Sequence, residues 1–560
     1  MTQPCTFNLV DEAWIRARAL DGDVRELSIR QVFSDASQYR SLSNELPTQD
    51  FAILRVLLAI LQRSLNDEMA DNKSPSDIWG ELWDDDNLPM EFINQYLDKW
   101  HDHFDLLDHE MPFMQSPGLC SSKGGVDGVA KIIADVPDGN PFFVLRNEES
   151  LKALSYAEAA RWLIHVQAFD TSGIKTGMVG DPTAKGGKSY PIGTGWAGRI
   201  GGLFFEGDDL RETLLLNLIL SGESNDEPFS PDDLPAWERG DYNLPKRERQ
   251  PSGRMDLYTW QSRRVLLKCE GGEVTGVLLT NGDKVSPQDM QDEEPMTGWR
   301  ESKNQAKKLG VAQVFMPVQH RANRAYWRGL DSLFPTSDAT EQEGVQYLRP
   351  GVVSWLVHLS SPNGGNKIPT SRFVSLHAVG AEYGTQSAVI TQIINDHLIF
   401  KASLLTEEGY KFANLARKCV KTTDGAVDQL AWFAANLYLA SGGDTEQTSG
   451  SRDLARSEAY FELDGAFRSW FERLDVSKDP TSLRNEWYET AQGILRRIAR
   501  RLVNDAGPAA IVGCKLKKKG GDEWMTAARA EGIFKHELNK ILPIEQQTDT
   551  GQKEKEETER

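Results

Sequence analysis

Glycine is concentrated in one stretch of this 560-residue chain to a degree that regular elements do not tolerate. Between Gly173 and Gly207, 11 of the 35 residues are glycine. Glycine loses more conformational entropy on ordering than any other residue, so this density excludes a helix. The stretch is therefore predicted to be a long loop system. It leads into an apolar segment, 210–220, that is expected to be buried.

The composition of the whole chain predicts a folded protein with localised functions. Hydrophobic residues make up 39% of it and include 15 Trp, which is ample material for packed cores. At about 150 residues per domain, the length allows two to four domains. The formal charge of −20 argues against a protein that coats nucleic acid with its whole surface, because DNA would repel it. Local basic sites remain compatible with this charge.

Several patterns bear on the compartment. Residues 1–16 lack a basic region followed by an apolar stretch, so no signal peptide is predicted. The most apolar run, 51–61, is interrupted by Arg55 and is far shorter than the ~20 residues that span a bilayer. The 5 cysteines are scattered, which favours neither a disulfide framework nor a zinc ribbon. We therefore expect a cytoplasmic protein with no membrane contact.

The order of the patterns predicts an α+β fold. Strands are expected at 257–268, 276–280 and 372–383. After residue 400 the residue pattern is typical of helices almost throughout, with candidate helices at 407–421, 427–440, 453–474, 482–504 and 523–541. The predicted domains are a large mixed domain over 1–400, with its long glycine-rich loops, and an all-α helical bundle over 401–544. A disordered charged tail is expected over 545–560.

Motifs for catalysis are weak. Gly193 to Gly198 has the spacing of a dinucleotide loop, but no helix can open after it and the acidic residue comes too early. Gly187-Lys188-Ser189 resembles the end of a P-loop that lacks its first glycine. One cluster contains metal-ligand types: His101, Asp102, His103, Asp105, Asp108 and His109. It leaves open a metal-dependent phosphohydrolase, against the simpler interpretation of a solvated turn. The sequence does not favour an enzyme.

Charge distribution is more informative. Between Lys175 and Arg199 four bases face one acid, and between Arg300 and Gly329 seven bases face only Glu301. A third block, 496–519, holds eight bases against Asp505. A single basic run is usually a solvated face, but three in an acidic chain, one of them within the glycine-rich loop, favour nucleic acid. Glycine lets a backbone approach phosphates closely, and lysine supplies the charge.

Several motifs resemble one known family. They are Asn8-Leu-Val-Asp-Glu-Ala-Trp-Ile15, Phe104-Asp-Leu-Leu-Asp-His-Glu-Met-Pro-Phe-Met-Gln115, Gly173-Ile-Lys-Thr-Gly177, Lys185-Gly-Gly-Lys-Ser-Tyr-Pro-Ile-Gly-Thr-Gly-Trp196 and Asp209-Leu-Arg-Glu-Thr-Leu-Leu-Leu-Asn217. Across nearly its whole length the chain resembles CasA, the large subunit of the type I-E CRISPR surveillance complex Cascade. The resemblance implies a C-terminal four-helix bundle and a function without catalysis, metal or cofactor.

The implied function is recognition of the protospacer-adjacent motif (PAM) in double-stranded target DNA. Such subunits help to start strand separation and R-loop formation, and they offer a docking surface to a recruited helicase–nuclease in antiviral defence. The implied partners are the crRNA and the backbone, small and handle-binding Cascade subunits. Guide pairing then reads the remaining target sequence, as in other RNA-guided effectors.

The resemblance also implies site residues. The PAM-reading glycine loop matches Gly173, Lys175, Thr176 and Gly177, and the minor-groove lysine matches Lys303, with Arg300 and Lys307 as alternatives. A wedge beneath the first base pair matches Gln386, with Thr385 and Ser387 beside it. Contact with the guide-RNA handle or another subunit matches Phe143, Leu145 and Arg146, although Phe143 also fits a buried strand aromatic. A basic bundle surface is assigned from charge and position to Arg496, Arg497, Arg500, Lys517 and Lys518.

Overall fold

The structure is a computed structural model that describes residues 6–65, 73–136, 151–221, 230, 232–240, 248–334, 345–516 and 522–545. The chain divides into two compact units, one up to Leu398 and one from Ile399 onward.

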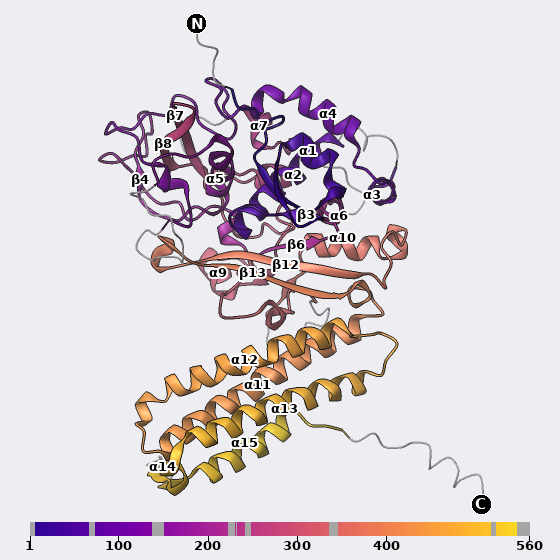
Figure 1. Ribbon diagram of the computed structural model, residues 1–560, viewed down its shortest axis with the longest axis vertical. Helices are drawn as coiled ribbons and strands as arrows, with labels where there is room; N and C mark the ends of the chain where they lie inside the picture. Colours follow the sequence, from indigo (N-terminus) through magenta and orange to yellow (C-terminus); the bar gives the residue numbers. More distant parts are fainter. Residues whose placement is uncertain are drawn as a thin grey trace, which may run out of the picture. The chain divides into compact units, whose positions relative to one another are not determined.

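The first unit mixes helices with several small sheets (Figure 1). Its helices are α1 (Ile29–Ser34), α2 (Pro47–Ser64), α3 (Pro75–Asp84), α4 (Met90–Lys99), α5 (Tyr156–Phe169), α6 (Leu210–Asn217), α7 (Ala236–Arg239), α8 (Arg254–Tyr258), α9 (Lys303–Leu309) and α10 (Gly351–Leu359). Its strands are β1 (Ile15–Ala19), β2 (Val24–Leu27), β3 (Tyr39–Leu42), β4 (Lys175–Thr176), β5 (Lys188–Ser189), β6 (Gly202–Glu206), β7 (Arg263–Glu270), β8 (Glu273–Asn281), β9 (Trp299–Glu301), β10 (Phe315–Pro317), β11 (Tyr347–Leu348), β12 (Phe373–Tyr383) and β13 (Ile390–Lys401).

The sheets pair strands that are near and far in sequence. Three of them have three strands each, in the orders β2-β1-β3, β10-β9-β11 and β13-β12-β6. β7–β8 and β4–β5 form two-stranded ladders. The strand predicted over 257–268 is partly wrong, because α8 occupies its first residues and β7 begins only at Arg263. Met255, Leu257 and Tyr258 of α8 are buried, so helical packing decides this segment.

α2 is the central helix of the first unit. Residues 51–61 are apolar except for Arg55, and every one of these side chains is buried. A helix that is apolar on all sides needs protein around its whole circumference. α2 meets this requirement by packing against α4, α5, α6, α8 and β12.

One buried ion pair links α2 to two loops. Glu294 accepts hydrogen bonds from the Arg55 guanidinium at 2.8 and 3.0 Å, and the two side chains are 0% and 2% exposed. The Trp196 indole N–H donates to the same carboxylate at 2.6 Å. Trp196 lies in the glycine-rich stretch, and Glu294 lies in the segment that leads to β9. The pair therefore anchors both segments to the core.

The second unit consists mainly of long helices packed side by side (Figure 1). Its elements are α11 (Tyr410–Ala440), α12 (Ser449–Glu472), α13 (Pro480–Asp505), α14 (Gly507–Val512), α15 (Ala527–Ile541), β14 (Cys514–Leu516) and β15 (Glu523–Met525). α11 packs against α12, α13 and α15. Four long helices thus share one core, lined by residues such as Phe433, Leu463, Trp487 and Phe534.

Two sequence-based helix predictions are corrected here. The predicted break between 421 and 427 does not exist, because α11 is continuous. The polar residues that suggested a turn find partners in the bundle: Thr423 accepts a hydrogen bond from the Trp487 indole at 2.9 Å, and Asp424 accepts one from the Tyr460 hydroxyl at 2.7 Å. The helix predicted over 523–541 begins only at Ala527, since residues 523–525 form β15. The prediction of an all-α bundle is therefore wrong in this detail, because β15 pairs with β14.

The first residue of the predicted disordered tail is held by the second unit. The Asn485 amide donates to the Glu545 carbonyl at 2.8 Å, and Arg484 pairs with the Glu545 carboxylate at 2.8 Å. The rest of the tail, 546–560, lies outside the described residues.

Glu294→Ala should lower the free energy of unfolding by about 3–5 kcal/mol, because it leaves the Arg55 charge buried without its partner. Arg55→Met/Glu294→Leu should recover part of that loss. Chemical unfolding followed by circular dichroism measures both effects. The matched control is Glu248→Ala, which removes a surface partner of Lys284 and should cost less than about 1 kcal/mol. An equal effect of the two alanine variants would contradict the anchoring role of Glu294.

Candidate nucleic-acid interface

The predicted glycine loop follows α5 and runs into a short hairpin. β4 pairs with β5 so that Lys175 lies opposite Ser189 and Thr176 opposite Lys188. Beyond β4, the Gly177 N–H donates to the Gly187 carbonyl at 3.1 Å. A Cβ on Gly177 would lie 2.8 Å from the Gly187 carbonyl carbon, so a larger residue would force the two backbones apart. Gly173, in contrast, has open space where a Cβ would point.

The Lys175 side chain turns inward. Its Nζ lies 2.6 Å from Oδ2 of Asp170, and the two side chains are 14% and 8% exposed. The Arg263 guanidinium, fully buried, donates to the same oxygen. Burial alone would raise the pKa of Asp170, but the charges of Lys175 and Arg263 outweigh it and hold this pKa below its usual value. The Lys175 ammonium thus faces a carboxylate within the chain, which does not fit a side chain that contacts DNA.

Arg263 also holds the backbone on both sides of the loop system. Its Nη2 donates to the Thr171 carbonyl and to the Gly193 carbonyl, each at 2.9 Å. Thr171 precedes the glycine loop, and Gly193 lies near the middle of the glycine-rich stretch. One guanidinium therefore sets where the loop starts and how the returning chain passes it.

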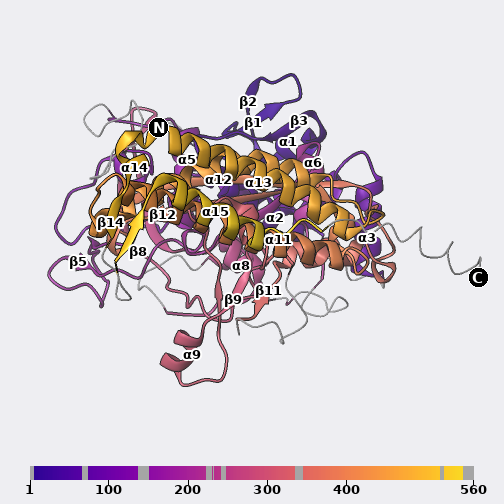
Figure 2. The same ribbon diagram turned by 90° about the horizontal axis from the view of Figure 1, so that it is seen from below.

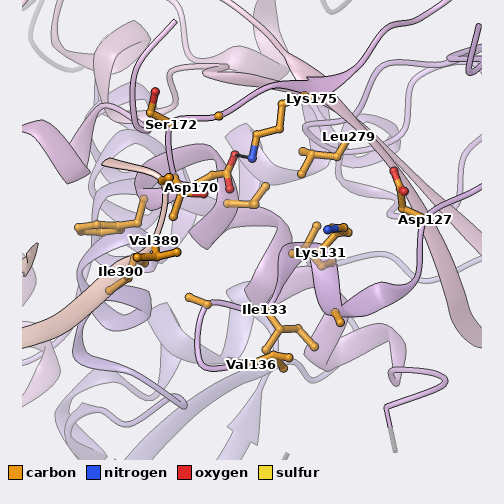
Figure 3. A pocket seen from close by; sticks show the side chains of 18 of the residues that line it. Asp127, Lys131, Ile133, Val136, Asp170, Ser172, Lys175, Leu279, Val389 and Ile390 are labelled. Carbon is orange, nitrogen blue, oxygen red and sulfur yellow. Dashed lines mark ion pairs between the residues drawn. The ribbon is translucent and has the colours of Figure 1, made fainter. Parts of the chain in front are cut away.

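A pocket of about 410 Å³ lies beneath the loop. Figure 3 shows Lys175 reaching Asp170 on one side of it, with Lys131 and Asp127 on the other. The Thr176 hydroxyl lies 3.4 Å from an Asp127 carboxylate oxygen, a long hydrogen bond. The apolar part of the lining includes Ile174, Phe169, Leu279 and Val389. Ile174 itself is 57% exposed, so the loop presents an apolar side chain next to its glycine.

The predicted wedge lies in the turn that joins β12 to β13. Gln386 and Ser387 have φ of 57° and 55°, a left-handed conformation that side-chain-bearing residues rarely adopt. The Gly384 N–H donates to Val389 at 2.9 Å and the Ser387 N–H donates to Gly384 at 2.9 Å, which closes the turn. Thr385 and Gln386 are exposed. The tertiary structure thus holds Gln386 in an unfavourable backbone conformation at an exposed tip.

The glycine loop and this turn are in direct contact. The Ser172 N–H donates to the Ser387 carbonyl at 2.8 Å, although the two residues are 215 positions apart in the chain. Gly173 is the next residue after Ser172, and Gln386 is the residue before Ser387. The structure therefore brings two of the sequence-predicted site segments together.

Lys303 lies on a third element of the same unit. It is the first residue of α9, which projects from the unit (Figure 2), and its side chain is exposed together with those of Lys307 and Lys308. Ser302 caps α9 by accepting a hydrogen bond from the Gln305 N–H at 3.4 Å. Arg300 lies apart from this helix, on β9, and is also exposed.

The basic block of the second unit is partly neutralised within the bundle. Arg497 pairs with Glu462 at 2.6 Å, and Arg501 pairs with Glu458 and Glu462 of α12. Arg496 donates to the Asn539 side chain at 2.6 Å. Arg500 is exposed and has no ion pair among the described residues. The positive surface offered here is therefore smaller than the sequence count indicated.

The histidine cluster separates into individual structural roles. His101 pairs with Asp11 at 2.7 Å, while the His103 ring lies 2.7 Å from the Trp237 carbonyl. Asp105 and Asp108 accept hydrogen bonds from backbone N–H groups. Among the residues that the structure describes, no three His, Cys, Asp or Glu side chains are placed to hold a metal ion. The geometry gives no support to the phosphohydrolase alternative.

Some predicted residues lie outside the described ranges: Phe143, Leu145, Arg146, Lys517 and Lys518. Other residues were missed by the sequence analysis, above all Asp170 and Arg263. A signal for Arg263 existed, because two arginines open an otherwise apolar strand, Arg-Arg-Val-Leu-Leu. An arginine in a buried strand requires a carboxylate or carbonyl partner. Nothing in the sequence alone identified Asp170 as that partner.

Within the part of the chain that the structure describes, no helix is long and apolar enough to cross a membrane.

Comparison with known proteins completes the description. Residues 8–499 match the family described as CRISPR-associated protein Cse1. CRISPR-associated protein CasA/Cse1 of Thermus thermophilus is 26% identical over 514 residues, covering 87% of this chain and 90% of that protein. The crystal structure of Thermobifida fusca Cse1 has a TM-score of 0.85 at 38% identity and covers 97% of this chain and 99% of its own.

The fold also matches a chain from a solved CRISPR RNA-guided surveillance complex, with a TM-score of 0.65 at 17% identity, covering 90% of this chain and 100% of that one. At this identity the likeness shows a shared fold. The family match, over nearly the whole length, confirms the resemblance seen in the sequence motifs. The chain belongs to the family of CRISPR-associated protein Cse1, also called CasA.

Proposed function

We propose that this protein is the non-catalytic large subunit of an RNA-guided CRISPR surveillance complex of the Cascade type. In that role it recognises the PAM in double-stranded DNA, helps to start strand separation and provides a docking surface for a helicase–nuclease. Its partners would be the crRNA, the backbone, small and handle-binding subunits, and the target duplex. Family membership and the fold shared with a chain of a solved surveillance complex support the assembly.

The observation that carries the proposal is the hydrogen bond between Ser172 and Ser387. It places a glycine loop and an exposed glutamine turn side by side, one suited to backbone approach and the other to insertion. Because Gly173 has no side chain, its backbone can approach the edge of a DNA groove closely. The base pairs show few distinguishing groups in the minor groove, so a few hydrogen-bond donors are enough to recognise a short motif there. A side chain inserted at a base step costs a few kcal/mol of unstacking, which contacts to groove and phosphates must offset.

In this proposal each element has a role for which its geometry is the support. Gly173 and Ile174 present backbone and an apolar side chain to the groove, while Lys175 stays with Asp170 and Arg263 and sets the loop conformation. Lys303 adds an exposed ammonium at the start of α9. Gln386 occupies the exposed tip of a turn closed by two backbone hydrogen bonds, where it can enter beneath the first base pair, with Thr385 beside it.

Gln386→Ala should slow strand opening on PAM-bearing duplex by about tenfold or more, because no side chain then fills the opened base step, whose unstacking still costs a few kcal/mol. Gln386→Gly should behave alike, since glycine adopts the positive φ without strain and only the side chain is removed. Opening is followed with a fluorescent base analogue next to the PAM in a reconstituted complex. Gln392→Ala, an exposed glutamine on β13, is the matched control. Wild-type opening by both Gln386 variants would disprove the wedge.

Lys303→Ala should weaken binding of PAM-bearing duplex and make the salt dependence less steep by about one unit on a log–log plot, as expected when one cation in the groove no longer displaces a counterion from the DNA. Lys307→Ala tests the neighbouring position on α9, and Lys152→Ala is an exposed control elsewhere in the unit. Equilibrium binding to the reconstituted complex at several salt concentrations gives both quantities. If all three variants match the wild type, a scaffold that binds only partner proteins becomes the better interpretation.

A further inference from the structure

A second pocket, of about 830 Å³, shares Ser172 with the pocket of Figure 3 and also contains Ser387. Its floor is the sheet β10-β9-β11. Arg300 on the central strand lies opposite Met316 on one side and Tyr347 on the other. Directly paired residues point to the same face of a sheet, and all three line the pocket. Arg300 therefore extends from the middle of the floor, with an aromatic ring beside it.

The walls come from three other segments. One is the loop before η6 (Tyr326–Gly329), which carries Arg321 and Arg324 and turns tightly through a bridge between them. The second is the end of β12 with the turn residue Ser387, and the third is the glycine-rich stretch near Gly193 and Arg199. The predicted wedge thus stands at the edge of this pocket.

The pocket lining carries an excess of positive charge, with four arginines against two acids. Arg300, Arg321 and Arg324 are all exposed, and none of them forms an ion pair within the described ranges. Arg199 is more deeply placed and donates to the Val285 and Ile192 carbonyls; burial lowers its pKa to about 10. The acids in the lining are Asp331 and Glu382, and Glu382 already accepts a hydrogen bond from the Ala322 N–H at 3.1 Å.

This lining fits the chemistry of an unpaired nucleotide. Guanidinium groups bind phosphate through paired N–H donors, and an aromatic face stacks on any base. The Tyr383 hydroxyl donates to the Phe169 carbonyl at 2.7 Å, so this ring is fixed and is not assigned to stacking. Tyr347 on the floor is half-buried and is the aromatic side chain that we assign to the base. Pockets of roughly 300–1,000 Å³ suit ligands of nucleotide size. A duplex keeps its bases stacked inside and cannot offer one to the floor of such a pocket.

We infer that this arginine pocket binds single-stranded DNA, with phosphates on Arg300, Arg321 and Arg324 and one base against Tyr347. Where this single strand comes from rests on the proposed function. A DNA strand separated at Gln386 would lie next to Ser387, which lines the pocket. Capture there would oppose re-pairing of the opened duplex, so the wedge and the pocket act on successive stages of opening.

The test uses the full chain and a fluorescent oligothymidine, with binding followed by anisotropy over a range of salt concentrations. Arg300→Ala/Arg324→Ala should weaken binding at low salt by about tenfold or more, with a log–log salt slope less steep by about 0.7 for each phosphate that is no longer neutralised. Tyr347→Ala should weaken binding about tenfold because the base no longer stacks, while Tyr347→Phe should bind like the wild type. Thermal melting at the wild-type temperature shows that each variant is folded.

Two controls separate the pocket from general charge effects. Arg18→Ala/Arg25→Ala removes the same charge from exposed positions on β1 and β2, which lie on the other side of the unit from β9 in Figure 2, and should bind like the wild type. Lys152→Ala, an exposed lysine elsewhere in the unit, should also keep single-strand binding.

Three results would overturn the inference: unchanged binding by the pocket variants, no binding of oligothymidine by the wild type at low salt, or equally strong competition by a blunt duplex of the same length. The oligonucleotide contains no PAM and needs no opening. A failure of the PAM proposal therefore leaves this measurement unaffected, and a failure here leaves the Gln386 and Lys303 predictions intact.

Discussion

The carboxylate of Asp170 receives an ammonium and a guanidinium together, from Lys175 and Arg263, in surroundings that are almost out of contact with water. Three charges in such a place are stable only as a set, because removing one leaves the others buried and uncompensated. The set has a geometric consequence. Asp170 comes directly after α5, Lys175 begins β4, and the residues between them must form the loop that carries Gly173 and Ile174. The conformation of the loop in the candidate interface therefore depends on these three buried charges.

The same constraint extends to the turn at Gln386. Arg263 holds the Thr171 carbonyl, and the next residue, Ser172, donates to Ser387. A left-handed conformation costs about 1–3 kcal/mol for a residue with a side chain, so two in succession persist only where the surroundings impose them. Here the conformation is imposed by the flanking strands β12 and β13, by the hydrogen bonds within the turn and by the bond from Ser172. A turn held by these contacts suits the insertion proposed for Gln386, because a loosely held turn would fold away instead of parting two bases.

Basic residues in this chain fall into two kinds that the composition cannot distinguish. In the block at 496–501, Arg497 and Arg501 of α13 form ion pairs with glutamates of α12. Part of the positive charge of this block is therefore neutralised by the chain itself. Around β9, Arg300, Arg321 and Arg324 form no ion pair in the described ranges and line a pocket. A count of bases along the sequence predicts the sign of a region. Whether that charge is available to a ligand depends on the residues that the fold places opposite.

Much of the fold class was predictable from local patterns, because they reflect short-range physics. A dense glycine run excludes regular structure wherever it occurs, and an apolar helix such as α2 must be enclosed. One prediction failed because polar residues found distant partners. Thr423 and Asp424 indicated a break, yet Trp487 and Tyr460 satisfy them and α11 continues. The motifs also identified the family, since they are specific strings that need no knowledge of spatial neighbours.

By itself, then, the sequence determined the mixed architecture with a helical C-terminal part, the glycine loop, the basic segments and the family. Only the tertiary structure decided that Lys175 turns inward, that Gln386 stands in a strained and exposed turn, and that Ser172 joins it. Each of these depends on a contact between residues far apart in the chain, such as Asp170 with Arg263. Burial makes those contacts strong by removing water, and no local pattern specifies which distant residues will share a buried place.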